Sequence, residues 1–221
     1  MAKIAIDGPA GAGKSTIAKA VAKELGWIYV DTGAMYRAIG LAALREGIVI
    51  KEQISEIEAM LPEIELRLRY ENSVQRILLN GEDVSEAIRT PEASVAASDV
   101  SAIPAVRAAM LTQQRNIAEQ ENVVMDGRDI GTVVLPDAEL KVFLTASAHA
   151  RAKRRCKELM EKGQQVVFAD VLKDIEYRDK QDSGRAVAPL QQAEDAILVD
   201  TTHLTLEQSI ESVMNLVRTK L

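Results

Sequence analysis

The sequence predicts an α/β fold of three layers, in which helices flank a central parallel β-sheet. Three observations predict it. Short apolar segments alternate with amphipathic segments of helical length along most of the chain. A glycine-rich turn at residues 8–13 separates the first apolar segment from the first helix. A later apolar segment, 122–125, runs directly into the carboxylate of Asp126, at the strand end where parallel sheets carry their binding sites.

The chain begins with two strand-helix units. A strand over residues 3–7 precedes a helix over about 14–25, and a strand over 27–30 precedes a helix over 33–46. Parallel strands need long crossover connections, usually helices, so this alternation favours parallel pairing.

The pattern changes between about residues 51 and 90. Ile64, Leu66 and Leu68 alternate with charged residues, which predicts a half-solvated strand, and 75–79 predicts a second one. Asn80-Gly81 is a strong signal for a tight turn after it. We interpret this segment as a small inserted antiparallel subdomain.

The core pattern then returns. We expect a helix over 104–120, strands over 122–125, 141–145 and 197–199, and helices over 148–162, 169–181 and 206–220. A chain of 221 residues suits a single domain. We divide it into a core of about 1–50, 91–147 and 186–221, the insert at 51–90, and a helical lid at about 148–185.

Composition excludes several classes of protein. The net charge is −6 and aromatic residues make up 3%, which argues against binding to nucleic acid. The single cysteine, Cys156, builds no disulfide framework and fits a reducing compartment. No apolar stretch has the length of a signal peptide or a membrane span, so we expect a cytoplasmic protein without membrane contact.

Residues 8–15 match the pattern G-x-x-x-x-G-K-[ST] of a phosphate-binding loop, or P-loop. Glycines let backbone N–H groups turn around phosphate oxygens, and the following helix directs its N-terminal dipole at the same anion. Lys14 would reach the β- and γ-phosphates, and the Ser15 hydroxyl would bind Mg²⁺. The alternative is a glycine-rich turn without a ligand, which the strand and helix on either side disfavour.

Asp126 ends a buried strand and faces the same crevice as the phosphate loop in a parallel sheet. An aspartate in this position can hold Mg²⁺ or its water shell. Alternatively it begins a turn or caps a helix.

Several arginines lie where a second phosphate would be held. Arg37 lies one turn into the second helix, and Arg178, Asp182 and Arg185 share one helix face by their spacing. The alternative for Arg37 is a solvated helix residue, and for Arg178 and Asp182 an ordinary surface ion pair.

A second basic cluster comprises Arg151, Lys153, Arg154 and Arg155. On a mobile lid such arginines would close over the transferred phosphoryl group and exclude water. From spacing alone, a solvated helix face explains the cluster equally well.

The motifs together resemble bacterial cytidylate kinase. The resemblance rests on residues 6–16 and 31–37, on 126–134, and on 178–190. It covers nearly the whole chain, and the last two motifs are far more specific than the phosphate loop. The segment around 63–84 also resembles the extra subdomain of the long bacterial form.

The resemblance implies transfer of the γ-phosphoryl group of ATP to CMP or dCMP, with Mg²⁺, in pyrimidine metabolism, by a monomer. It implies catalytic roles for Lys14, Arg128, Arg154 and Asp126. It also implies that Ser15 binds the metal directly and that Asp126 binds it through water. The ATP contacts it implies are Gly8, Pro9, Ala10, Gly11, Ala12, Gly13, Lys14, Ser15, Thr16, Arg151 and Arg155. The acceptor phosphate would be held by Arg37 and Arg128. The base would be surrounded by Thr32, Arg107, Asp129 and Arg185, and the sugar would be contacted by Ser98, Arg178 and Asp182.

Base selectivity has a physical reason in this assignment. The exocyclic amine of cytosine can donate to Asp129, and Arg107 can donate to its N3 or O2. Uracil reverses this pattern and leaves buried polar groups unpaired, at about 1–3 kcal/mol each. The phosphate loop alone leaves other acceptors open: UMP, dTMP, AMP and shikimate. A GTPase switch is disfavoured because no N-K-x-D motif is present.

Overall fold

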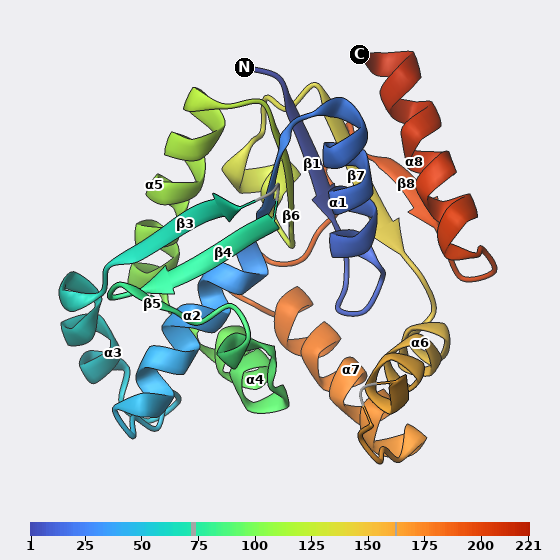
Figure 1. The fold of residues 1–221 in the computed structure, drawn as a ribbon. Helices are drawn as coiled ribbons and strands as arrows, with labels where there is room; N and C mark the ends of the chain where they lie inside the picture. The colour runs from blue at the N-terminus through green and yellow to red at the C-terminus, as the bar shows by residue number, and fades with distance from the viewer. Residues whose placement is uncertain (72–73, 162) are drawn as a thin grey trace.

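The computed structural model describes residues 1–71, 74–161 and 163–221. Its main sheet has five parallel strands in the order β2-β6-β1-β7-β8. The strands are β1 (Lys3–Asp7), β2 (Ile28–Asp31), β6 (Val123–Gly127), β7 (Leu140–Thr145) and β8 (Ile197–Asp200). Figure 1 shows the two chain ends at the same side of this sheet, away from α6 (Ala148–Glu161) and α7 (Phe168–Ser183).

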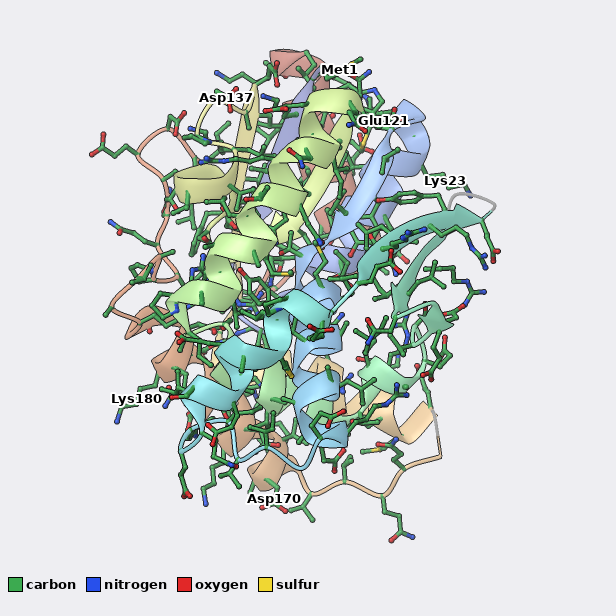
Figure 2. The ribbon with its side chains drawn as sticks, turned by 90° about the vertical axis from the view of Figure 1, so that its left-hand side faces the viewer. Met1, Lys23, Glu121, Asp137, Asp170 and Lys180 are labelled. Carbon is green, nitrogen blue, oxygen red and sulfur yellow. The ribbon has the colours of Figure 1, made fainter. Side chains whose placement is uncertain are left out.

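Helices cover both faces of the sheet, which confirms the predicted three layers. Ile4 and Ile6 of β1 face α1 (Lys14–Leu25) and α8 (Leu206–Lys220). Ala5 points to the opposite face, where it packs in a cluster with Ala118 of α5 (Pro104–Gln120). Figure 2 shows α5 along this second face, with Glu121 after its end and near Met1. Because the side chains of successive strand residues point to opposite faces, the apolar residues of β1 pack against the helices on both sides of the sheet.

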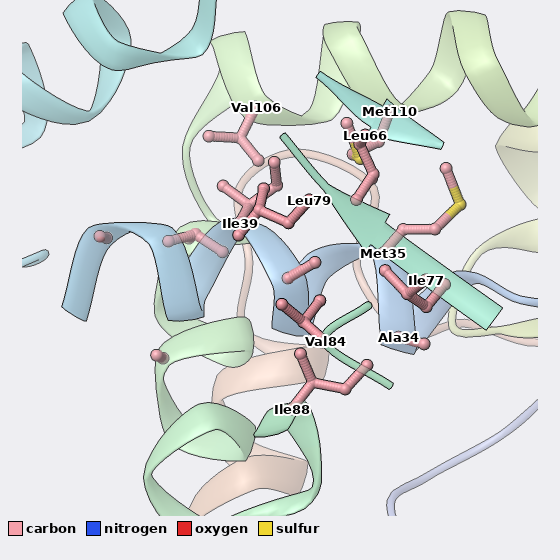
Figure 3. Close-up of a cluster of buried hydrophobic side chains, with 14 of the residues drawn as sticks. Ala34, Met35, Ile39, Leu66, Ile77, Leu79, Val84, Ile88, Val106 and Met110 are labelled. Atoms are coloured by element: carbon pink, nitrogen blue, oxygen red, sulfur yellow. The ribbon is translucent and has the colours of Figure 1, made fainter. Parts of the chain in front are cut away.

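The insert forms a separate antiparallel sheet of β3 (Leu66–Glu71), β4 (Val74–Leu79) and β5 (Glu82–Asp83). One face of this sheet, with Leu66, Ile77 and Leu79, packs against Met35 and Ile39 of α2 (Thr32–Arg45) (Figure 3). The helix α3 (Ile54–Met60) and the turn Leu61–Glu63 lead into it. The sheet therefore shares a core with the helix that follows β2.

Two helices in this region were not predicted: α3 and α4 (Pro91–Val100), which follows the turn Ala87–Arg89. The start of α4 does carry a signal, since Thr90 accepts from the Ala93 N–H and Pro91 stands at the first helical position. Its apolar residues are small, so its period is weak. The helix packs closely on α2 because Gly40 has no side chain; a Cβ there would lie 2.8 Å from that of Ala96.

Helices α6 and α7 form a pair with a small core of their own, which includes Ala152, Cys156 and Ile175. In Figure 1 they lie below the sheet, with α7 between α6 and α4. The helix predicted over 169–181 is confirmed within two residues at both ends, and the one predicted over 148–162 is confirmed over 148–161, since residue 162 lies outside the described residues. The division of the chain into core, insert and lid stays a prediction.

Within the described ranges, no single helix has the length and apolar composition needed to cross a membrane. The helices α4 and α5 pass that test only when taken together, with a bend of 99° between them.

Candidate active site

The phosphate loop has the backbone that its glycines predict. Gly8 has a φ of 148°, and a Cβ on it would lie 1.9 Å from the carbonyl oxygen of Leu144. Gly13, with a φ of 92°, precedes α1 and supplies no side-chain cap. The first N–H groups of α1 therefore point into the loop without a side-chain acceptor, as an anion site requires.

Lys14 lies across this loop. Its Nζ donates 2.8 Å to the carbonyl oxygen of Pro9, and the residue is 5% exposed. Burial and the nearby Arg128 lower the pKa of Lys14 to about 7. Phosphate oxygens in the loop would reverse this effect, because an anion favours the charged ammonium.

Asp126 lies at the end of β6, opposite Asp31 in the neighbouring strand. One carboxylate oxygen accepts 2.9 Å from the Ser15 hydroxyl, and the other accepts 2.8 Å from the Tyr29 hydroxyl. Burial and the charge of Asp31 raise the pKa of Asp126 to about 6. A cation beside Asp126 would favour the charged carboxylate and therefore act against this rise in pKa.

The donor set at this point fits a hard divalent cation. A serine hydroxyl and a carboxylate are oxygen ligands, and Mg²⁺ usually takes only one or two protein ligands with substrate phosphates and water. The residues that the structure describes contain no cluster of three or more acidic, histidine or cysteine ligands that would hold a metal without the nucleotide. The site thus suits a metal that arrives with ATP.

A pocket opens beside the phosphate loop, between α2, α4, α7 and the end of β6. All nine residues predicted to contact the acceptor line it: Thr32, Arg37, Ser98, Arg107, Arg128, Asp129, Arg178, Asp182 and Arg185. Six further lining residues were not predicted: Gly33, Tyr36, Ser94, Ala97, Ser101 and Gly127. Five arginines against two aspartates leave an excess of three positive charges in a chain of net charge −6.

Asp129 and Arg107 form a buried ion pair in the wall of the pocket. Burial raises the pKa of Asp129, although Arg107 and Arg185 act in the opposite direction. The Arg107 guanidinium also lies 5.9 Å from the ring centre of Tyr36. The pair presents an acceptor and a donor side by side in the same wall.

Elsewhere in the pocket wall, α7 faces the end of β6. The Arg128 Nε donates 2.6 Å to Asp182, and the Arg185 Nη1 donates 3.1 Å to the Ser101 hydroxyl. Burial by itself would raise the pKa of Asp182. The charge and hydrogen bond of Arg128 act against it, and the pKa of Asp182 is lowered overall. Asp182 turns inward and pairs with Arg128, which takes the place of the surface ion pair with Arg178 that the sequence left as an alternative.

Three pocket residues carry a buried polar atom without a hydrogen-bond partner: Ser98 Oγ, Arg178 Nε and Arg185 Nη2. Buried polar groups in folded proteins nearly always have partners, so these three atoms are available to a ligand or to water that enters the pocket. Their grouping in one charged pocket indicates a polar anionic ligand.

Sequence reasoning missed several residues that support the site, among them Tyr29, Asp7 and Gln75. Asp7 ends β1 and accepts from the N–H groups of Ile130 and Gly131, at 2.8 and 2.7 Å. These residues begin the π-helical turn Ile130–Val134, directly after Asp129. The strand-end position that drew attention to Asp126 applies equally to Asp7.

Gln75 of β4 accepts 2.9 Å from the Asp31 N–H, at the free edge of β2. Asp31 in turn caps α2 and pairs with Arg37 at 3.0 Å. Nothing in the local sequence relates Gln75 to this site, since the contact depends on how the insert packs.

The arginines of α6 have different surroundings. Arg151 is buried and binds backbone carbonyls and Asp179. Arg154 donates to the hydroxyl and the carbonyl of Thr201, after β8, and Arg155 pairs with Glu158 at 2.8 Å. The predicted contacts of these arginines with ATP and the transferred group stay predictions, and Arg151 already makes four hydrogen bonds to other partners.

A phosphate loop and an arginine-rich acceptor pocket at the same end of a parallel sheet define a P-loop phosphotransferase that acts on a small anionic acceptor. The sequence model for cytidylate kinase matches residues 4–219. The chain is 53% identical to the cytidylate kinase of Caldicellulosiruptor saccharolyticus over 213 aligned residues. This alignment covers 96% of the present chain and 94% of the relative. It is 54% identical to the cytidylate kinase of Caldanaerobacter subterraneus subsp. tengcongensis over 216 aligned residues, which make up 98% of the present chain and 94% of the relative.

The chain therefore belongs to the cytidylate kinase family, and the prediction of an ATP-dependent CMP kinase is confirmed. Kinases of this kind use ATP with a divalent metal. A solved structure of an uncharacterized protein from Eubacterium ventriosum aligns over 99% of both chains with a TM-score of 0.55 at 13% identity, a likeness of fold alone.

Proposed function

We propose that this protein transfers the γ-phosphoryl group of Mg²⁺-bound ATP to the phosphate of CMP or dCMP. The observation that carries the proposal is the acceptor pocket beside the phosphate loop, with five arginines and three partnerless polar atoms in its wall. A nucleoside monophosphate supplies what this wall lacks: a dianionic phosphate, sugar hydroxyls and a polar base edge.

The acceptor phosphate would bind between Arg37 and Arg128. Arg37 comes from the first turns of α2 and Arg128 from the end of β6, so the two guanidinium groups can approach one phosphate from two elements. Their present partners, Asp31 and Asp182, would compete with the phosphate for these charges.

Thr32, Arg107, Asp129 and Arg185 would surround the cytosine. The buried pair of Arg107 and Asp129 supports this role, since it offers the acceptor and donor that cytosine needs. Ser98, Arg178 and Asp182 would contact the sugar, which accords with the partnerless Ser98 Oγ and Arg178 Nε.

ATP would bind with its phosphates in the loop formed by residues 8–16. Ser15 directly and Asp126 through water would hold Mg²⁺, which would supply positive charge against the phosphate oxygens. Lys14, Arg128 and Arg154 would neutralise charge on the transferred group, and Arg151 and Arg155 would lie near ATP on the lid. The transfer needs no covalent intermediate, because positioning and charge neutralisation carry most of its catalysis.

A coupled assay of ADP release tests the proposal with a panel of acceptors: CMP, dCMP, UMP, dTMP, AMP and shikimate. We expect fast turnover with CMP and dCMP, weak turnover with UMP and none with the others. Replacement of Lys14 by Met should remove most of the rate; a near-normal kcat in that variant, or a preference for another acceptor, would contradict the assignment. Sedimentation of the same sample tests whether the protein is the expected monomer.

A further inference from the structure

Arg151 connects the first lid helix to the phosphate loop. Its Nη1 donates 2.8 Å to the carbonyl oxygen of Ala10 in the loop, and its Nε donates 2.8 Å to the carbonyl oxygen of Ala146. The residue is only 4% exposed. A buried guanidinium in this place fixes loop backbone, which a solvated lid arginine would not do.

Asp179 of α7 completes the arrangement. Its carboxylate accepts from Arg151 Nη1 at 3.0 Å and from Nη2 at 2.6 Å. A two-point contact between guanidinium and carboxylate sets the angle as well as the distance between two elements. The phosphate loop, α6 and α7 are thus joined through one side-chain pair.

The loop also packs directly on this pair of helices. A Cβ on Gly11 would lie 3.4 Å from the Cβ of Arg151 and 3.8 Å from the Cδ1 of Ile175. Contact and hydrogen bonding therefore act at the same place, and displacement of α7 would disturb the tip of the loop.

Helix α7 carries acceptor-pocket residues immediately beside this attachment. Arg178 precedes Asp179, and Asp182 lies one turn further on; both line the acceptor pocket. Asp182 is itself bound to Arg128 at 2.6 Å. The helix is thus fastened once to the phosphate loop and once to the end of β6, with the acceptor pocket between.

We propose that Arg151 and Asp179 are positioning residues that couple the ATP phosphate loop to the acceptor-binding face of α7. The identity of the two ligands rests on the proposed function. With the pair intact, a loop ordered by ATP phosphates holds α7 where Arg178 and Asp182 meet the acceptor. Coupling between binding sites is reciprocal, so bound CMP must favour the same loop arrangement.

The test compares the wild-type protein with Asp179→Asn, which keeps the side-chain size but removes the charge and one acceptor. Calorimetry gives the Kd of CMP with and without a non-hydrolysable Mg-ATP analogue. We expect the analogue to tighten CMP binding by about 5-fold or more in the wild type, the usual range for coupled sites, and by less than 2-fold in the variant. The KM for CMP should rise several-fold while kcat at saturation changes little.

Arg151→Lys, which keeps the charge but loses the two-point contact, should act in the same direction. Glu176→Gln is the matched control, because Glu176 is exposed on the same helix and the substitution removes the same charge. It should leave the coupling factor at the wild-type value.

Two results of the calorimetry overturn the inference. They are a wild-type coupling factor of one, and a coupling factor that is unchanged in Asp179→Asn, whether or not the variant has a lower Tm. Hydrogen exchange of the amides of residues 10–13 gives a readout that needs no ligand, and exchange in Asp179→Asn that equals exchange in Glu176→Gln also overturns it. If the wild type binds no CMP, the proposed function fails while this exchange measurement still tests the attachment.

Discussion

The hydroxyl of Ser15 donates a hydrogen bond of 2.9 Å to the carboxylate of Asp126. Ser15 belongs to the first turn of α1 and Asp126 to the end of β6, a strand that pairs in parallel with β1. Tyr29 holds the second carboxylate oxygen at 2.8 Å. A cation that arrives with ATP would therefore meet a hydroxyl and a carboxylate whose orientation is already fixed.

Asp126→Asn should lower kcat by about 100-fold or more, in the range seen when one charge-stabilising group is removed from an active site. The amide keeps the shape of the side chain but loses the charge that attracts the cation. The measurement is kcat as a function of Mg²⁺ concentration. Asp137→Asn, an exposed aspartate with 67% side-chain exposure, is the control. A kcat within twofold of the wild type would rule out the metal role.

Ser98→Ala should separate binding from stability. The Ser98 hydroxyl is buried without a partner, so its removal should leave the free energy of unfolding unchanged or slightly increased. If the hydroxyl contacts the acceptor sugar, the KM for CMP should rise by about 3- to 10-fold, corresponding to one hydrogen bond of about 1 kcal/mol. Urea unfolding and steady-state kinetics check both parts. A destabilised variant with unchanged KM would refute this reading.

Asp129→Ala should weaken the discrimination between CMP and UMP. In the proposed assignment the carboxylate accepts from the cytosine amine, and without it the pocket wall around the base would keep mainly donors. We expect the ratio of kcat/KM for CMP to that for UMP to fall by about 10-fold or more, since a site built to pair polar groups rejects analogues strongly. An unchanged ratio would remove Asp129 from base recognition.

The pH dependence of ATP use should follow Lys14. Because burial and Arg128 lower its pKa to about 7 in the free protein, the ammonium form is present below this pH and is lost as the pH rises through it. We expect kcat/KM for ATP, which reports the free enzyme, to fall above about pH 7. The profile of kcat should stay flat to higher pH, because bound phosphates favour the ammonium. Identical profiles for both constants would contradict this explanation.

Gly40→Ala should destabilise the contact between α2 and α4. The added methyl would lie 2.8 Å from the Cβ of Ala96 and 3.0 Å from its carbonyl carbon, so one helix must move. Overpacking of this kind costs about 1–3 kcal/mol, measurable by urea unfolding. Adding Ala96→Gly should recover part of the loss. A fully stable Gly40→Ala protein would show that α4 shifts freely.

Local features of the chain were predictable because their causes are local. The glycine spacing of residues 8–13, between an apolar strand and an amphipathic helix, predicts the phosphate loop without any tertiary information. Helix α4 was missed because small residues leave a weak apolar period, although Thr90 and Pro91 marked its start.

The acceptor residues were predicted through the family resemblance, while their partners were not. Spacing alone favoured an ion pair between Arg178 and Asp182 on a surface, but the tertiary structure pairs Asp182 with Arg128. Gln75 had no detectable signal, since its contact with Asp31 depends on the packing of the insert on α2.

By itself the sequence determined the fold class, the phosphate loop and the family, because each follows from the order and type of neighbouring residues. Only the tertiary structure decided which charges meet. It gathers five arginines from different elements into one pocket of a chain with net charge −6, and it buries Arg151 against the phosphate loop. The physical reason is that electrostatic interaction depends on distance in space, which separation along the chain does not fix.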